Sequence, residues 1–194
     1  MKLAVLIAAL LIAATAAAAA AIDRVSTTPT AASCGGTLWR MKTLSDPGRR
    51  SVRLASMTTT IAAIGGRPFP RPLPKERRTP FQRQTWEVVA QVTQYRLEDG
   101  GVRLVLFDAG SYLNAVIPTP SCLSSRTRAR EQIAAAWQQL SVDCAPPKPE
   151  WQPLGAIVYI RGVGFWSQRG ALGGSARNGA ELHPVTGFRI VAGC

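Results

Sequence analysis

The fold is decided by residues 86–107, WEVVAQVTQYRLEDGGVRLVLF. Alternate residues from Trp86 to Val92 are apolar, which is the period of a strand with one buried face. The turn Glu98-Asp99-Gly100-Gly101 follows, and its glycines can take positive φ. The apolar run Val102–Phe107 then returns, so this stretch predicts a β-hairpin.

The residues downstream extend this hairpin into a larger β-structure. Asp108-Ala109-Gly110 predicts a second turn and Ser111–Ile117 a third strand. A helical pattern lies between Cys122 and Cys144, with an N-cap expected at Ser124 or Ser125. Two further strands are expected at Ile157–Phe165 and Ala180–Val191. The order β-β-β-α-β-β is that of the oligonucleotide- and oligosaccharide-binding fold, so we expect a mainly β, OB-like Greek-key barrel stapled by disulfides.

The chain divides into segments of different composition. They are a signal peptide (1–21), a flexible spacer (22–33), an N-terminal extension (34–64), a Pro/Arg-rich connector (65–80) and the barrel (81–194). Within the extension, Met57–Ile64 predicts an outer strand. The connector predicts extended chain, because its prolines exclude helix and central strand. It is either a basic arm that lies along an anionic partner or an ordered connector packed over the barrel.

The first segment has the pattern of an export signal. Lys2 is followed by the apolar run Leu3–Leu11 and by the small residues Ala14–Ala21, which predicts cleavage after Ala21. A transmembrane anchor is the alternative, but the strongly apolar part is short for a bilayer core of about 30 Å. We therefore expect an exported protein, periplasmic or extracellular, without a stable transmembrane anchor.

Four cysteines remain in the mature chain, at positions 34, 122, 144 and 194. In an oxidising compartment they predict two disulfides. The expected helix holds Cys122 and Cys144 roughly 20 Å apart, beyond the reach of a disulfide. We therefore favour the pairs Cys34–Cys122 and Cys144–Cys194. No pair has CxxC spacing, and no cofactor or metal site is predicted.

The net charge is +12 for the full chain and +11 once Lys2 leaves with the leader. A basic excess attracts anions, so the partner that the charge favours is an anionic polymer, either nucleic acid or glycan. Acidic lipid headgroups are a further alternative. The plain alternative is a generally basic surface, because a GC-rich genome enriches arginine without selection for binding.

Six short motifs carry a family resemblance. They are Met41–Asp46, Met57–Ile61, Leu104–Leu106, Ile117–Cys122, Arg161–Phe165 (RGVGF) and Asn178–Val185 (NGAELHPV). On these motifs the mature chain resembles a bacterial family of exported hypothetical proteins. The resemblance supports the architecture and implies no established activity. The family commonly has an acidic residue and a histidine in the turn into the second strand, where Gly101 and Arg103 stand here, so it implies no metal or catalytic role for that turn.

The candidate catalytic residues are Glu181 and His183, two apart on the last strand, with Asp108 as a third group. A histidine beside carboxylates can perform acid–base chemistry, which suggests a secreted nuclease-like hydrolase. The alternative is that His183, followed by Pro184, is a structural hydrogen bonder at the end of a strand.

The candidate ligand-binding residues are Arg103, Tyr112 and Asn114 on the second and third strands, with Trp166 and Arg169 in the loop after the fourth. For Trp166, a place at the edge of the core is the alternative. We expect a non-enzymatic binding module, with the nuclease-like hydrolase and a structural envelope protein as alternatives. The sequence indicates no oligomeric state.

Overall fold

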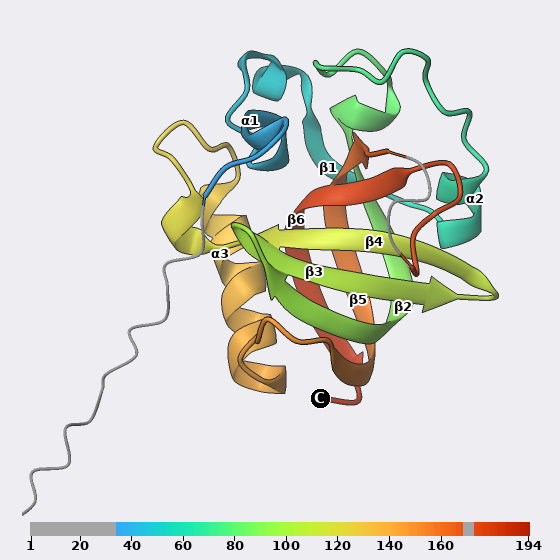
Figure 1. The fold of residues 1–194 in the computed structure, drawn as a ribbon, viewed down its shortest axis with the longest axis vertical. Helices are drawn as coiled ribbons and strands as arrows, with labels where there is room; N and C mark the ends of the chain where they lie inside the picture. The colour runs from blue at the N-terminus through green and yellow to red at the C-terminus, as the bar shows by residue number, and fades with distance from the viewer. Residues whose placement is uncertain (1–33, 169–172) are drawn as a thin grey trace, which may run out of the picture. The chain divides into compact units, whose positions relative to one another are not determined.

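Long strands form the centre of the structure, a computed structural model that describes residues 34–168 and 173–194 (Figure 1). They are β2 (Gln84–Glu98), β3 (Gly101–Asp108), β4 (Ser111–Pro118), β5 (Gln152–Trp166) and β6 (Ala180–Ala192). Each expected strand is present, with its ends moved by a few residues, so the prediction of a mainly β protein is confirmed. The expected leader (1–21) and spacer (22–33) lie outside the described residues.

The strands form one sheet in the order β1-β2-β3-β4-β6-β5, and β2 also pairs with β5. The β2–β3, β3–β4, β2–β5 and β5–β6 pairs are antiparallel, whereas β1–β2 and β4–β6 are parallel. Strand β2 therefore has three neighbours, and the hairpin predicted from residues 86–107 lies at the centre of the pairing scheme.

The main core lies on one face of this sheet. Alternate residues of β2 from Trp86 to Val92 are buried there, as the sequence predicts. The β2–β3 register then shifts between Val92 and Gln94. A register shift of this kind changes which residues face inward, so Tyr95 is 1% exposed although it breaks the alternation.

Helix α3 (Arg130–Gln139) continues into a π-helical turn (Leu140–Cys144) and begins later than expected. The N-cap predicted at Ser124 or Ser125 is wrong, because the helix starts after Ala129, whose φ is 59°. Arg128 fixes the preceding segment: its Nη1 donates to the backbone carbonyls of residues 49, 50 and 52 at 2.8–3.1 Å. This tertiary contact, and not local capping, sets the start of the helix.

The N-terminal extension contains α1 (Trp39–Lys42), η1 (Pro47–Ser51), β1 (Arg53–Thr58) and α2 (Ile61–Gly65). An outer strand exists at Arg53–Thr58, so only Met57 and Thr58 of the predicted stretch belong to it. Residues 61–64 are helical, which corrects the prediction for Met57–Ile64. Thr60 caps α2 by accepting a hydrogen bond from the Ala63 N–H, and the two isoleucines at helical spacing are buried.

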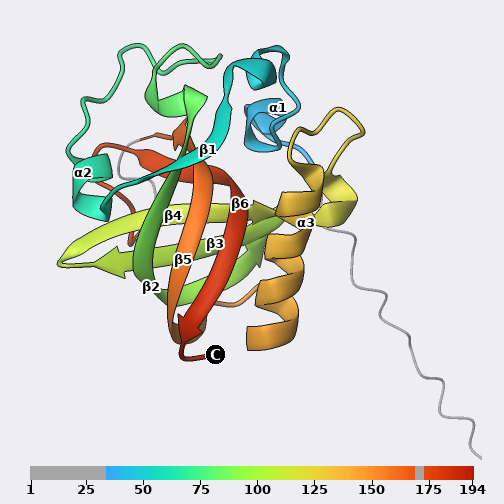
Figure 2. The ribbon, with the colours of Figure 1, turned by 180° about the vertical axis from the view of Figure 1, so that it is seen from behind.

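The extension contributes to both faces of the sheet: Ile61 and Ile64 of α2 belong to the main core, whereas the part before β1 packs on the opposite face. There Leu44 and Val52 form a small second core with Val163 of β5. In both views α1 and β1 lie at the end of the molecule far from the C-terminus, and α2 and α3 lie on opposite sides of the strands (Figure 1 and Figure 2). The extension is therefore an integral layer of the fold.

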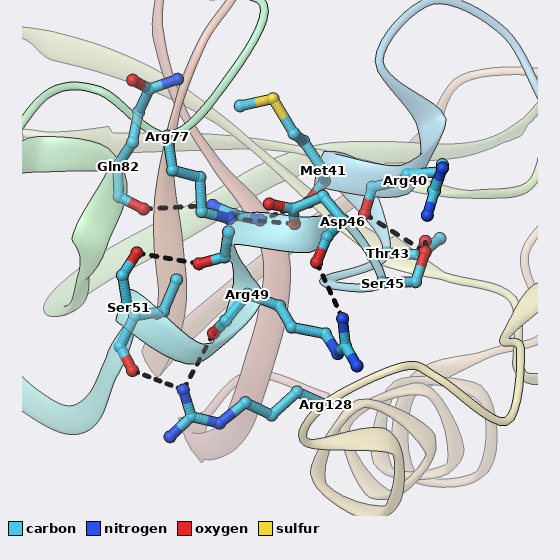
Figure 3. Close-up of polar contacts among 12 residues, drawn as sticks. Arg40, Met41, Thr43, Ser45, Asp46, Arg49, Ser51, Arg77, Gln82 and Arg128 are labelled. Atoms are coloured by element: carbon cyan, nitrogen blue, oxygen red, sulfur yellow. Dashed lines mark hydrogen bonds and ion pairs between the residues drawn. The ribbon is translucent and has the colours of Figure 1, made fainter.

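The connector runs from α2 to η2 (Phe81–Arg83) and is tied to the extension by Arg77, which is 3% exposed. Arg77 Nε lies 3.1 Å from Asp46 Oδ1, and its Nη atoms donate to the carbonyls of Met41 and Gln82 at 2.6 and 3.1 Å (Figure 3). Phe69 and Leu73 pack against the main core. These contacts match the alternative of an ordered connector.

Both expected disulfides are formed, Cys34–Cys122 and Cys144–Cys194. The first joins the extension to the segment before α3, and the second joins the end of the π-helical turn to the C-terminus. No helix within residues 34–168 and 173–194 is long and apolar enough to cross a membrane. Two disulfides fit an exported protein.

Candidate functional site

Four of the candidate residues from the sequence come together on the outer face of β3, β4 and β6. Asn114 pairs with Val105 of β3 and with Glu181 of β6, while the next residues, Ala115 and Leu182, face the main core. Side chains alternate along a strand, so Arg103, Asn114, Glu181 and His183 share the outer face. Candidates proposed separately for binding and for catalysis thus lie in one region.

Ion pairs link the charged members of this region. Arg103 Nε lies 2.7 Å from Glu98 Oε2, and Arg103 Nη1 lies 3.3 Å from Glu181 Oε1. Arg96 adds a second bond to Glu98 at 2.7 Å. Burial lowers the pKa of Arg103, but Glu181 and Glu98 more than offset this effect, so its pKa is raised. Arg103 therefore stays charged and is already bound by two carboxylates.

His183 is 4% exposed, and neither of its ring nitrogens has a hydrogen-bond partner among the described residues. Its ring lies 5.6 Å from that of Phe165. Burial holds its pKa well below the usual range, and the charges of Lys42, Arg103 and Arg77 lower it further. His183 is thus a buried neutral imidazole, and it is not the hydrogen bonder expected at the end of the strand.

Helix α1 covers this region from outside. Lys42 lies 5.6 Å from the Phe165 ring centroid, and burial lowers its pKa although Glu181 opposes the shift. The Trp39 ring packs against the turn at Gly100, where a Cβ atom would overlap it. A groove of about 510 Å³ remains between α1 and this turn. We call Lys42, Glu98, Arg103, Glu181 and His183 the polar cluster.

The candidate catalytic residues Glu181 and His183 are enclosed or already paired in the structure. The ring nitrogens of His183 are enclosed, and Glu181 is occupied by Arg103. Asp108 lies at the far end of β3, and strand alternation places it on the opposite face from Arg103. Among the described residues, no group of three or more His, Cys, Asp or Glu side chains could hold a metal ion. The ion pairs of the cluster instead join β3 to β2 and β6, and Lys42 of α1 lies over Phe165 beside them.

The remaining candidates are dispersed. Tyr112 is 44% exposed and packs on Phe107 with ring centroids 4.9 Å apart. Trp166 is buried in the main core, and its Nε1 donates to Thr79 Oγ1 at 3.0 Å, which matches the alternative of a core-edge residue. Arg169 lies outside the described residues. By strand alternation Tyr112 shares the outer face of β3 and β4 with Arg103 and Asn114 but lies toward the other end of these strands, whereas Trp166 belongs to the main core.

A second region, on the connector and the edge of β1, is open and basic. Its main groove, which we call the Trp86 groove, has a volume of about 470 Å³ and is lined by Ser51, Arg53, Met57, Arg67, Pro80, Arg83, Gln84 and Trp86. A neighbouring groove shares two of these residues, Ser51 and Arg83, and adds Lys75 and Arg78. A third shares Lys75 and Arg78 and adds Arg71.

We call the exposed and half-buried cations of these three grooves the basic surface, which leaves out the buried Arg77. They are Arg53, Arg67, Arg71, Lys75, Arg78 and Arg83, of which Arg67 is half-buried and the others are exposed. Among the described residues that line the grooves, Glu76 is the one exposed carboxylate, because Asp46 is buried against Arg77. A surface with this imbalance of charge attracts oxyanions.

Sequence reasoning located only part of this surface. The composition of the connector, in the basic-arm alternative, indicated five cations, and four of them belong to this surface while Arg77 is buried. Arg53 and Arg83 were missed because they come from outside the connector, and the parallel pairing of Arg53 with Gln84 brings them to the same groove. A parallel pairing between distant segments leaves no signal in a single sequence.

No protein-family model and no curated protein matches the chain. Among solved structures, the chain is similar to one described as an aspartyl-tRNA synthetase from Leishmania major Friedlin, with a TM-score of 0.43 and 12% sequence identity. The likeness covers 74% of this chain and 22% of the length of that protein.

Proposed function

We propose that this protein is an exported, non-enzymatic binding module that holds an anionic polymer on its basic surface. The observation that carries the proposal is the basic surface itself, with six cations and one exposed carboxylate along three connected grooves. Long-range attraction by such a surface brings a polyanion to the protein and weakens as salt is added.

Export is part of the proposal. The leader at residues 1–21 has the order of a signal peptide, and the two disulfides fit an oxidising compartment. The polymer would then be one that occurs outside the cytoplasm, in the periplasm or beyond the cell.

The strand pairings also support the proposal. The pairings β2–β3, β3–β4, β4–β6, β6–β5 and β5–β2 form a ring, and α3 lies between β4 and β5 in the chain. We infer that this ring closes a small Greek-key barrel, an architecture that presents polymers with a rigid binding surface. In this chain α1 lies over part of the outer face of β3 and β4, so we expect the polymer to bind at the connector.

The test is retention of the mature protein on a heparin column eluted with salt. In the variant Arg53→Glu/Arg83→Glu, two exposed cations of the Trp86 groove are reversed, and we expect affinity to fall by about tenfold or more at low salt. The matched control is Arg126→Glu/Arg130→Glu, which makes the same charge change on exposed arginines near the start of α3.

Retention of the control variant close to that of the wild type would support the basic surface. If both variants lose affinity equally, the net charge of the chain explains binding and the basic surface does not. A wild-type protein that passes through the column at low salt contradicts the proposed function.

A further inference from the structure

Arg67 differs from the other arginines of the basic surface because its side chain is held in place. Its guanidinium carbon lies 4.2 Å from the centroid of Trp86 and 5.6 Å from that of Phe81. Asn178 Nδ2 donates to the backbone carbonyl of Arg67 at 2.9 Å and fixes the main chain. The guanidinium is therefore pre-positioned, so a ligand would lose less side-chain entropy on binding there than at a mobile arginine.

The hydrogen-bonding capacity of Arg67 is unused. Its Nε is buried and has no acceptor among the described residues, and no described carboxylate forms an ion pair with it. The buried Arg77 is the opposite case, with acceptors from Asp46, Met41 and Gln82. A guanidinium that is fixed by aromatic rings and has no acceptor is suited to bind a planar or tetrahedral oxyanion.

The aromatic residues of the basic surface indicate the class of polymer. Sites for single-stranded nucleic acid combine cations with exposed aromatic rings, on which each stacked base contributes about 1–3 kcal/mol. Trp86 is the one aromatic residue that lines the three grooves in the described part of the chain; it is 7% exposed and Arg67 lies over its ring. The exposed aromatic residues, Tyr112 and Trp151, lie outside these grooves.

The described residues of the basic surface thus provide positive charge but no exposed aromatic ring on which a nucleobase could stack. A sulfate, phosphate or carboxylate substituent projects from a sugar ring and can enter a groove of about 470 Å³ that has Arg67 in its wall. Nucleic-acid phosphates are diester links within the backbone and not substituents on a sugar ring.

We infer that the Trp86 groove binds an oxyanion substituent of an anionic polysaccharide, with Arg67 as the main contact and Arg53 and Arg83 beside it. This inference rests on the proposed function and adds the class of polymer and the binding residue. It requires oxyanion substituents on the ligand and no nucleobases.

The experiment compares four probes at equal low salt by titration calorimetry: dextran sulfate, neutral dextran, a single-stranded poly(dT) 20-mer and a 20-base-pair duplex. We expect dextran sulfate to bind at least about tenfold more tightly than poly(dT) or the duplex, and neutral dextran to show no binding. Arg67→Met keeps apolar packing over Trp86 and removes the charge, so we expect a loss of about tenfold for dextran sulfate. Arg130→Met is the matched control and should bind like the wild type.

Each result separates the inference from the proposed function. If poly(dT) or the duplex binds as tightly as dextran sulfate, the polysaccharide class is wrong while the proposed function stands. If Arg67→Met and Arg130→Met bind dextran sulfate equally, Arg67 is not the contact. Should Arg67→Met unfold, Arg53→Gln, at an exposed position, takes its place with an expected loss of several-fold. If none of the polyanions binds, the proposed function itself fails.

Discussion

The polar cluster under α1 and the basic surface on the connector use the same residue type in opposite ways. Arg103 of the polar cluster is 12% exposed in its side chain and is bound by Glu98 and Glu181. Arg53 and Arg67 of the basic surface have no described acceptor for their guanidinium groups. Other arginines of the basic surface do have acceptors, since Arg83 donates to the Arg77 carbonyl at 2.7 Å and Arg78 pairs with Glu76 at 3.4 Å. The contrast therefore lies between Arg103 and the two arginines Arg53 and Arg67.

The comparison has a measurable consequence. Arginines whose donors are satisfied inside the protein should contribute to the free energy of unfolding, because their loss leaves buried acceptors unpaired. Arginines without acceptors should contribute to binding and little to folding. The three predictions below test this division, beginning with the largest effect.

Arg77 belongs to the connector, but its guanidinium, like that of Arg103, has hydrogen-bond acceptors within the protein. In Arg77→Met, Asp46 keeps a buried carboxylate without its ion-pair partner, so we expect the free energy of unfolding to fall by about 3–5 kcal/mol. Urea denaturation followed by circular dichroism measures this loss. The adjacent Arg78→Met, at an exposed position, should leave the midpoint unchanged. Similar midpoints for both variants would show that the Arg77 contacts contribute little.

Arg103 and Arg53 test the division directly. Arg103→Gln leaves Glu181 buried without its ion-pair partner, so we expect a loss of about 1–3 kcal/mol in the free energy of unfolding and unchanged affinity for heparin. Arg53→Gln should weaken heparin binding several-fold and leave unfolding unchanged. Denaturation and heparin titration of both variants provide the measurements. A loss of heparin affinity in Arg103→Gln at constant fold would place the binding site at the polar cluster.

His183 predicts a dependence of stability on pH. Its folded pKa is held well below the ordinary value by burial, whereas in the unfolded chain it titrates near pH 6.5. Below about pH 6.5 the unfolded state binds a proton that the folded state does not. The free energy of unfolding should therefore fall as pH falls from about 6.5 to 5, by at most about 1.4 kcal/mol per pH unit.

His183 is the one histidine in the sequence, which makes the measurement selective. The variant His183→Leu should lose less stability over this range than the wild type. In the folded wild type, the imidazole C–H resonances should not titrate between pH 7.5 and 5. A resonance that titrates near pH 6.5 would show that the side chain is open to water and that the polar cluster is not closed.

Contacts between residues close together in the chain could be predicted from the sequence, and contacts between distant residues could not. Arg103 and Asn114 were placed together correctly because both belong to the β3–β4 hairpin, whose register follows from a short turn. The enclosure of His183 was not predictable, because it depends on α1, more than a hundred residues earlier in the chain. The burial of Trp166 depends similarly on Phe69, Thr79 and Phe81.

The sequence by itself determined the strands, the hairpins and the favoured cysteine pairs, because alternation, turn glycines and helix length act over a few residues. The resemblance to exported hypothetical proteins and the signal peptide stay predictions. The tertiary structure decided which arginine side chains find hydrogen-bond acceptors within the protein. Arg77, Arg103 and Arg128 find acceptors in segments distant along the chain, while Arg53 and Arg67 find none among the described residues. Hydrogen bonds between distant segments form only once the fold brings their partners together. The sequence alone therefore could not distinguish the arginines that have acceptors from those that have none.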